Sequence, residues 1–199
     1  MFVFGHVGLT WGGALLLTRL TRRRQPFGAG VDFRLVIVGS MLPDIIDKPL
    51  GVFVLSDELG TGRAFAHSLA FVAAIALGAL LRLGASRRAL AAVALGAAAH
   101  LVFDRMWTQP ESLLWPLLGW RLEREDVSGW LEQMLEQLFS DPYTYVSEAA
   151  GAAIVVVLLV SLIRARGLRD FLRYGRMAAS GAGRPRGGLA AGQERPQEP

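Results

Sequence analysis

The chain has 199 residues, of which 52% are hydrophobic and 19% charged, and this balance excludes an ordinary soluble globular domain and favours an integral membrane protein. It contains no cysteine, which excludes disulfides and thiolate metal sites, so any metal must be held by nitrogen and oxygen ligands. The net charge of +4 comes from arginines at the ends of apolar segments, a pattern that indicates membrane topology rather than nucleic-acid binding.

Five segments are long and apolar enough to predict membrane-spanning helices of about 20 residues each. Short polar links that contain glycine join the first four segments, which predicts antiparallel neighbours. We therefore expect an all-α integral membrane bundle with about five transmembrane helices, multi-pass in the plasma (inner) membrane. The five segments are residues 2–20, 34–55, 65–83, 89–107 and 148–163.

The arginines predict the orientation of this bundle. They gather around the first link, around the third link and after the fifth segment, and these positions share one side if there are five spans. Because cytoplasmic loops carry an excess of lysine and arginine, we expect the N-terminus outside and the C-terminus in the cytoplasm. The membrane domain is predicted to cover residues 1–165. Residues 166–199 are predicted to form a basic, disordered cytoplasmic tail.

An amphipathic helix is predicted between the fourth and fifth spans, within an extracytoplasmic segment at residues 108–147. The sequence VSGWLEQMLEQLF at 127–139 places apolar residues on one face and Glu and Gln on the other. Such a helix lies in the outer interface or caps the bundle. The sequence supports two interpretations of this helix equally: it packs over the end of the bundle, or it acts as a functional lid.

Ionisable residues inside a bilayer are costly, so each is a candidate for a functional site. The predicted topology places all three histidines of the chain in the outer half of the membrane, together with three aspartates. Several are spaced by three or four residues, so that they share a helix face, including Arg63 with His67 if a helix begins by about Arg63. The layer consists of His6, Asp44, Asp47, His67, His100 and Asp104.

Histidine and carboxylate groups that converge between helices can hold a divalent metal. This donor set suits Zn²⁺ first, with Mn²⁺ or Fe²⁺ as alternatives. Arginine cannot ligate a metal, but Arg63 is suited to bind a phosphate or carboxylate. A bound metal lowers the pKa of a coordinated water to near neutrality and supplies a hydroxide nucleophile, which predicts metal-assisted hydrolysis.

Each of these residues also has a structural interpretation. His6 can serve as a hydrogen-bonding group between helices. Asp104 can pair with Arg63 or Arg105 instead of binding a metal, and Asp47 can pair with Lys48. These alternatives stay open for single residues, although six such residues in one layer favour a metal or ion site.

Four motifs in chain order resemble the YdjM/YbcI family of membrane-bound, metal-dependent hydrolases. They are His6, GSMLPDIIDK (39–48), RAFAHSL (63–69) and HLVFDRMWTQPESLLWP (100–116). The family shows an early histidine, an LPD with a further aspartate, an HS after a basic residue, and an HxxxD followed by a tryptophan-proline. One departure is that the family often has PDxDH where this chain has PDIIDK, which shifts the second aspartate and replaces the histidine.

The resemblance implies a multi-helix membrane protein with a hydrolase site whose metal ligands are His6, Asp44, His67, His100 and Asp104. The motif order is also faintly similar to that of zinc-dependent phospholipase C, which is all-helical with histidine and aspartate ligands. That similarity suggests a lipid phosphoester as substrate.

The leading hypothesis is a membrane metal hydrolase that acts at the non-cytoplasmic face on a lipid or other amphiphilic phosphoester or ester. Asp44, Asp47 and Arg63 are its candidate catalytic residues: Arg63 binds the anionic part of the substrate, and Asp47 acts as ligand, base or support for a ligand. The membrane lipid is the expected partner, and no nucleic acid is expected. The rivals are an ion or proton transporter that uses the buried His and Asp residues, and a non-catalytic membrane scaffold.

Overall fold

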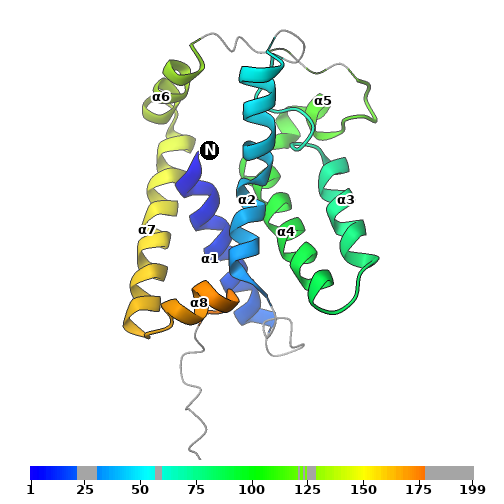
Figure 1. Ribbon diagram of the computed structural model, residues 1–199. Coiled ribbons are helices and arrows are strands. Elements are labelled where there is room, and N and C mark those ends of the chain that lie inside the picture. Colours follow the sequence, from blue (N-terminus) through cyan, green and yellow to red (C-terminus); the bar gives the residue numbers. More distant parts are fainter. Residues whose placement is uncertain (22–30, 57–59, 121, 123, 125–128, 178–199) are drawn as a thin grey trace, which may run out of the picture.

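The structure is a computed structural model that describes residues 1–21, 31–56, 60–120, 122, 124 and 129–177. All regular structure in these residues is helical (Figure 1), which confirms the all-α prediction. The elements are α1 (Val3–Thr21), α2 (Phe33–Lys48), η2 (Pro49–Val54), α3 (Leu69–Leu80), α4 (Gly84–Phe103), η3 (Met106–Thr108), α5 (Pro110–Leu113), α6 (Trp130–Ser140), α7 (Pro142–Arg164) and α8 (Leu168–Tyr174).

The long helices pack in the order α7, α1, α2, α4 and α3, with α1 also touching α4. Among the described residues, α4 and α7 are long and apolar enough to cross a membrane. The expected number of five spans and the orientation therefore stay predictions. The first and second predicted spans correspond to α1 and to α2 continued by the π-helix η2.

The arginine-rich ends of the helices lie at one end of the bundle. In Figure 1 the end of α1, the start of α2, the α3–α4 turn and the end of α7 are all at the bottom, beside α8. The loop before α3, the end of α4 and helices α5 and α6 lie at the other end. This antiparallel arrangement agrees with the short links seen in the sequence and separates the arginines of these helix ends from the predicted polar layer.

The predicted helix at 65–83 begins later than expected. Helix α3 starts at Leu69, where the Ser68 hydroxyl caps the Phe71 amide. Residues 61–68 are irregular, so Arg63 and His67 are not one turn apart on a helix, and that expectation is wrong. The physical reason is Asp47, whose carboxylate binds the backbone amides of this irregular segment and replaces the helical hydrogen bonds.

The fourth predicted helix, at 89–107, begins and ends earlier in the chain than expected. Helix α4 starts at Gly84, whose φ of +62° suits glycine, so the predicted link at 84–88 is its first turn. The helix ends at Phe103 rather than 107, because Asp104 and Arg105 leave the helical conformation.

Glycines allow two helix pairs to approach at backbone distance. A Cβ added to Gly8 of α1 would overlap the backbone of Gly151 in α7, and one added to Gly39 of α2 would overlap the Val93 carbonyl of α4. Small residues at helix crossings are the usual means of close packing in membrane bundles. The Gly39 crossing brings together the two helices that carry Asp44 and His100.

The hydrophobic core lies at the arginine-rich end. Trp11 stacks on Phe171 of α8 with ring centroids 5.0 Å apart, and Leu162 packs in the same cluster. The Phe33 amide donates to Gly175, which fixes the end of α8 to the start of α2. The prediction that all of 166–199 is disordered is therefore wrong for α8, because the buried Phe171 anchors it, while 178–199 lie outside the described residues.

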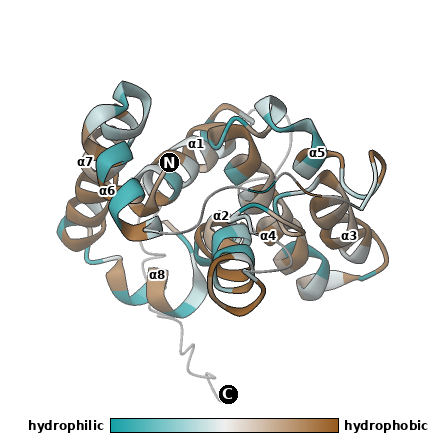
Figure 2. Cartoon of the chain, turned by 90° about the horizontal axis from the view of Figure 1, so that it is seen from above, coloured by the Kyte–Doolittle hydropathy of each residue, from teal (hydrophilic) through white to brown (hydrophobic). Residues whose placement is uncertain are grey.

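Helix α6 confirms the predicted amphipathic helix. It starts at Trp130, whose ring meets Phe53 edge-on with centroids 6.0 Å apart. Leu131, Leu135 and Phe139 of the same helix are exposed. Seen from the end of the bundle that carries α5 and α6, these two helices have hydrophilic stretches, whereas α3 is largely hydrophobic (Figure 2).

Candidate metal centre

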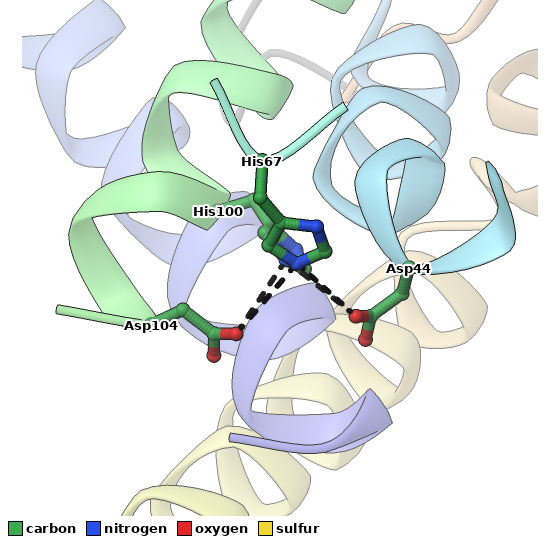
Figure 3. A group of neighbouring side chains, drawn as sticks. All are labelled: Asp44, His67, His100 and Asp104. Atoms are coloured by element: carbon green, nitrogen blue, oxygen red, sulfur yellow. Dashed lines mark hydrogen bonds and ion pairs between the residues drawn. The ribbon is translucent and has the colours of Figure 1, made fainter. Parts of the chain in front are cut away.

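Four side chains from three parts of the chain converge near the α6 end of the bundle (Figure 3). One ligand atom from each lies within 4.8 Å of the others, and two imidazoles sit between two carboxylates. Helix α2 supplies one carboxylate, the irregular segment before α3 one imidazole, and the end of α4 the other two groups. The set is Asp44, His67, His100 and Asp104, which are four of the five predicted ligands.

Asp47 holds His67 in place. Its two carboxylate oxygens accept hydrogen bonds from the backbone amides of Ala64, Ala66 and His67 at 2.9–3.0 Å. The Nδ1 of His67 lies 2.8 Å from the same carboxylate. A carboxylate that receives amide protons is an acceptor, so Nδ1 carries the proton and Nε2 of His67 is left with a lone pair. Asp47 therefore supports a candidate ligand, one of its three expected roles, and the alternative pairing with Lys48 is wrong.

A backbone carbonyl performs the same task for His100. The Nδ1 of His100 donates to the carbonyl oxygen of Ser40 at 2.6 Å, so its Nε2 also carries a lone pair. Pro43 has no N–H and cannot complete the helical hydrogen bond to residue 39, which opens the ladder of α2 at this turn. The carbonyl freed in this way is that of Gly39, and the next one, that of Ser40, accepts from His100 where α2 and α4 cross.

The two lone pairs point at each other. Nε2 of His67 and Nε2 of His100 lie 3.1 Å apart, and both imidazoles are fully buried. Two unprotonated nitrogens at this distance repel unless a proton or a metal cation lies between them. The carboxylate oxygens around the two nitrogens indicate whether a proton or a metal cation fits this position better.

Asp44 presents one oxygen to this point and keeps the other for Lys48. Its Oδ2 accepts from the Lys48 ammonium at 2.7 Å. Its Oδ1 lies 3.5 Å from Nε2 of His67 and 3.8 Å from Nε2 of His100, and it is buried without a hydrogen-bond partner. A single shared proton between the imidazoles would leave this buried oxygen unsatisfied, which is costly.

Asp104 closes the group from the opposite side. As the C-cap of α4, it places Oδ2 at 3.8–3.9 Å from the Nε2 atoms of His67 and His100. The Arg63 Nε lies 3.5 Å from Oδ2, so one of the two proposed arginine pairs of Asp104 is present. Its Oδ1 contacts the amino group of Met1 at 2.8 Å.

His6 lies beside the four groups rather than among them. Its ring stacks on that of His100 with centroids 3.9 Å apart and 15° between the planes. Its Nε2 lies 3.0 Å from Oδ1 of Asp104, but neither ring nitrogen makes a directed hydrogen bond. His6 is therefore placed to orient His100 and Asp104, and its own ligation stays a prediction.

Two cavities border the group from the α6 end. The larger, about 260 Å³, is lined by Arg63, Asp104, Arg105, Gln137 and Tyr143. The smaller, about 120 Å³, is lined by Lys48, Arg63, Asp104 and four residues of α6, namely Trp130, Gln133, Met134 and Gln137. Residues of helix α6 thus line both cavities beside the site, and Arg63 lines both as well.

One buried carboxylate was not predicted from the sequence. Glu148, at the start of the fifth predicted span, accepts hydrogen bonds from the amides of Phe2, Phe4 and Gly5 at 2.7–2.9 Å. It caps the N-terminal end of α1 and so fixes the turn that carries His6. Glu148 is the first residue of the predicted span at 148–163, so the rule that flags ionisable residues inside a span could have found it. The role of the Ser40 carbonyl has no sequence signal.

The donor set fits a divalent cation. A tetrahedral ion with bonds of about 2.0–2.2 Å separates its ligand atoms by roughly 3.4 Å. The five separations that involve an imidazole Nε2 are 3.1, 3.5, 3.8, 3.8 and 3.9 Å. A cation at the centre would use both lone pairs and the unpartnered oxygen of Asp44, whereas a proton would use two atoms. Two nitrogens and two carboxylate oxygens suit zinc and also manganese or iron, so the donor set names no single metal.

The comparisons with known proteins agree with the motifs. The family model described as YdjM inner membrane protein matches residues 1–169, a range that includes all six residues of the predicted layer and ends within α8. No curated protein and no solved structure matches the chain. Since the match covers most of the chain, the protein belongs to the YdjM inner membrane protein family.

Proposed function

We propose that this protein is a membrane-bound, metal-dependent hydrolase that acts on a lipid or other amphiphilic phosphoester or ester. The observation that supports this most strongly is the approach of the Nε2 atoms of His67 and His100 to 3.1 Å between two carboxylates. A divalent ion held there supplies Lewis-acid polarisation of the scissile group and acidifies a water molecule.

The surrounding residues hold these ligands in a fixed geometry. Asp47 and the Ser40 carbonyl orient the two imidazoles, and both contacts are buried. Supports of this kind commonly change metal affinity 10–100-fold when removed, according to general experience with such carboxylate–histidine pairs. Lys48 engages Oδ2 of Asp44 and leaves Oδ1 directed to the centre.

Arg63 is the proposed binding group for the anionic part of the substrate. It borders both cavities and lies beside Asp104, at the edge of the ligand set. A guanidinium presents a planar array of donors that matches phosphate or carboxylate oxygens. An inner-membrane protein with its site at one end of the bundle favours a substrate that is itself amphiphilic.

The direct test is metal content and turnover of the purified full-length protein in detergent. Elemental analysis is expected to find a divalent metal at about one ion per chain. Metal-dependent release of product is expected from a panel of lipid phosphoesters and esters. Alanine replacement of His67 or His100 is expected to remove both the metal and the turnover.

The control is Asp170→Asn, which alters an exposed carboxylate on α8 at the opposite end of the bundle. It should keep wild-type metal content and turnover. If the His67 and His100 variants retain both, the proposal is wrong. Metal binding without turnover, combined with ion flux in proteoliposomes, would instead support the transporter interpretation.

A further inference from the structure

A further cavity with charged walls lies at the end of the bundle away from the metal centre. It has a volume of about 280 Å³ and is bounded by the start of α2, the start of α4 and the end of α8, which all lie at the bottom of Figure 1. Its charged and polar lining residues are Asp32, Arg88, Tyr174 and Arg176, and Leu35 and two alanines of α4 supply an apolar wall. The function proposed above uses none of these residues.

Helix α8 is fixed against the start of α2, which gives this cavity a firm wall. Nη1 of Arg34 donates to the Leu172 carbonyl at 2.7 Å. Gly175 has a φ of +67°, and a Cβ added there would overlap the carboxylate of Asp32, so the chain passes the start of α2 at backbone distance. The next residue after this turn is Arg176, which lines the cavity.

The carboxylate of Asp32 already has a cation as its partner. Nε of Arg34 donates to Oδ1 at 3.0 Å and Nη2 donates to Oδ2 at 2.6 Å, so both oxygens of Asp32 are occupied. The hydrogen bonds from Arg34 also lower the pKa of Asp32, which keeps its carboxylate charged and paired. Its Oδ1 caps α2 by accepting from the Arg34 amide. The charge of Asp32 is therefore offset by Arg34 and not by the arginines that line the cavity.

Arg88 and Arg176 bring two further positive charges to the same cavity. One belongs to the second turn of α4, and the other follows the end of α8. Both side chains are exposed, and neither makes an ion pair with another residue of the described part of the chain. The cavity therefore has an excess of positive charge, which attracts an anion.

Exposed leucines around this cavity indicate that the anion belongs to a lipid. Leu81 and Leu83 in the α3–α4 turn are 75% and 85% exposed, and Leu172 on α8 is 64% exposed. In a member of an inner membrane protein family, leucines this exposed are expected to contact acyl chains. Arginines and a tyrosine beside them are then at the depth of the lipid headgroups.

We propose that this cavity binds the phosphate group of an anionic membrane lipid through Arg88 and Arg176. Planar guanidinium groups bind phosphate oxygens through paired, charge-assisted hydrogen bonds, and basic pockets between membrane helices are suited to such headgroups. The inference is independent of the proposed function, because the cavity lies away from the metal centre and needs no metal. A bound lipid would connect α8 to α2 and α4 and stabilise the folded protein.

The test measures binding of phosphatidylglycerol to the full-length protein in detergent by native mass spectrometry. One double variant carries Arg88→Gln and Arg176→Gln. The matched control carries Arg87→Gln and Arg169→Gln, which removes two exposed arginines from the same two helical regions, at positions that do not line this cavity. Wild type and control should bind the lipid with similar affinity, whereas the first double variant should bind it about tenfold more weakly or worse.

Thermal unfolding provides a second readout that does not depend on the spectrometer. All four substituted side chains are exposed, so both double variants should unfold near the wild-type midpoint without lipid. Added phosphatidylglycerol should raise the midpoint of wild type and control but not that of the Arg88 and Arg176 variant. Equal weakening of lipid binding in the two double variants would show a general effect of charge and would overturn the inference.

Two other ligands distinguish the source of the phosphate. Phosphatidylcholine should bind weakly to all three proteins, because its choline cation would meet the arginines, and equal binding of both lipids to wild type would overturn the inference. Inorganic phosphate should compete poorly with phosphatidylglycerol. Efficient competition, lost in the Arg88 and Arg176 variant, would keep the phosphate site and overturn the lipid as its ligand.

Discussion

His67 and His100 face each other through their Nε2 atoms, 3.1 Å apart, although they come from an irregular segment and from the end of α4. Each imidazole is locked by an acceptor at its other nitrogen, Asp47 in one case and the Ser40 carbonyl in the other. In the metal-free protein one proton can lie between the two nitrogens, whereas a cation between them engages both nitrogens and the flanking carboxylates of the folded state. Folding and metal binding should therefore be coupled.

Zinc should stabilise the folded protein, and removal of the metal should destabilise it. At a free zinc concentration about 100 times the dissociation constant, a ligand that binds the native state alone adds about 2.7 kcal/mol. Thermal unfolding in detergent, with chelator and with added zinc, measures the shift. His100→Ala should abolish the zinc-dependent shift, while Asp170→Asn should keep it. A full shift in the His100 variant would place the zinc elsewhere.

Asp44 and Asp47 should respond differently to replacement by asparagine. Asp47 accepts three backbone amides and one imidazole while fully buried, so Asp47→Asn should lower the free energy of unfolding by on the order of 3 kcal/mol. Asp44 accepts one hydrogen bond, from Lys48 to Oδ2, and its other oxygen is buried with no hydrogen-bond partner, so Asp44→Asn should lower metal-free stability less than Asp47→Asn and should remove metal binding.

Unfolding in chelator and zinc titration, carried out on both variants, separate these two effects. Equal loss of stability in the two variants would contradict the distinction between a supporting and a ligating carboxylate. A wild-type zinc affinity in Asp44→Asn would remove Asp44 from the ligand set.

The sequence predicted the site better than it predicted the segment that carries His67. Histidines and aspartates in an apolar chain are conspicuous because burial of each is costly, and four of the five proposed ligands do converge. The apolar run at 65–83 predicted a helix that includes His67, but the amides of Ala64 and His67 donate to Asp47, which is distant in sequence, and not to helical carbonyls. Local periodicity carries no information on such a contact.

Other features of the site could not be predicted from the sequence, because they too depend on contacts between residues that are distant in the chain. The acceptor for His100 is the backbone of Ser40, and a carbonyl is present in every residue. Glycine crossings such as Gly39 with α4 became evident only once the helix pairs were known.

Glu148→Gln should destabilise the protein and disturb the site from a distance. The carboxylate binds three amides at the start of α1, and an amide side chain would turn an N–H toward at least one of them. We expect a loss of about 1–2 kcal/mol in the free energy of unfolding. Zinc affinity should fall as well, since His6 of α1 contacts His100 and Asp104. Glu136→Gln on the exposed face of α6 is the control and should change neither quantity.

Gly39→Ala should separate α2 from α4 and weaken metal binding. The added Cβ would overlap the Val93 carbonyl, and backbone atoms cannot move aside cheaply. Overpacking of this kind costs about 1–3 kcal/mol, and it should also lengthen the contact between Ser40 and His100. Gly13→Ala is the matched control, because its Cβ would meet no atom within 4 Å, and it should be neutral or stabilise by about 0.5–1 kcal/mol. Equal behaviour of the two variants would show that the close approach of α2 and α4 has no energetic role.

Asp141 should make stability depend on pH at the end of the bundle that carries Tyr143. Its carboxylate accepts the Thr144 hydroxyl at 2.6 Å and the amides of Tyr143 and Thr144 at the start of α7. The hydroxyl first, and then the amides, hold the pKa of Asp141 below its ordinary value of 3.8. A lowered pKa in the folded state means that the stabilisation is complete above pH 3.8 and is lost as the pH falls through the folded-state pKa.

Asp141→Asn isolates this contribution, because asparagine is an equally good N-cap that does not titrate. The variant should be nearly as stable as wild type at neutral pH and should lose less stability on acidification. Thermal midpoints measured in detergent from about pH 7 to about pH 2 give the pH dependence of stability for wild type and variant, and the two should differ in the acidic part of this range. Parallel curves would mean that Asp141 keeps its ordinary pKa, so that the hydrogen bonds at the start of α7 would not favour its charged form.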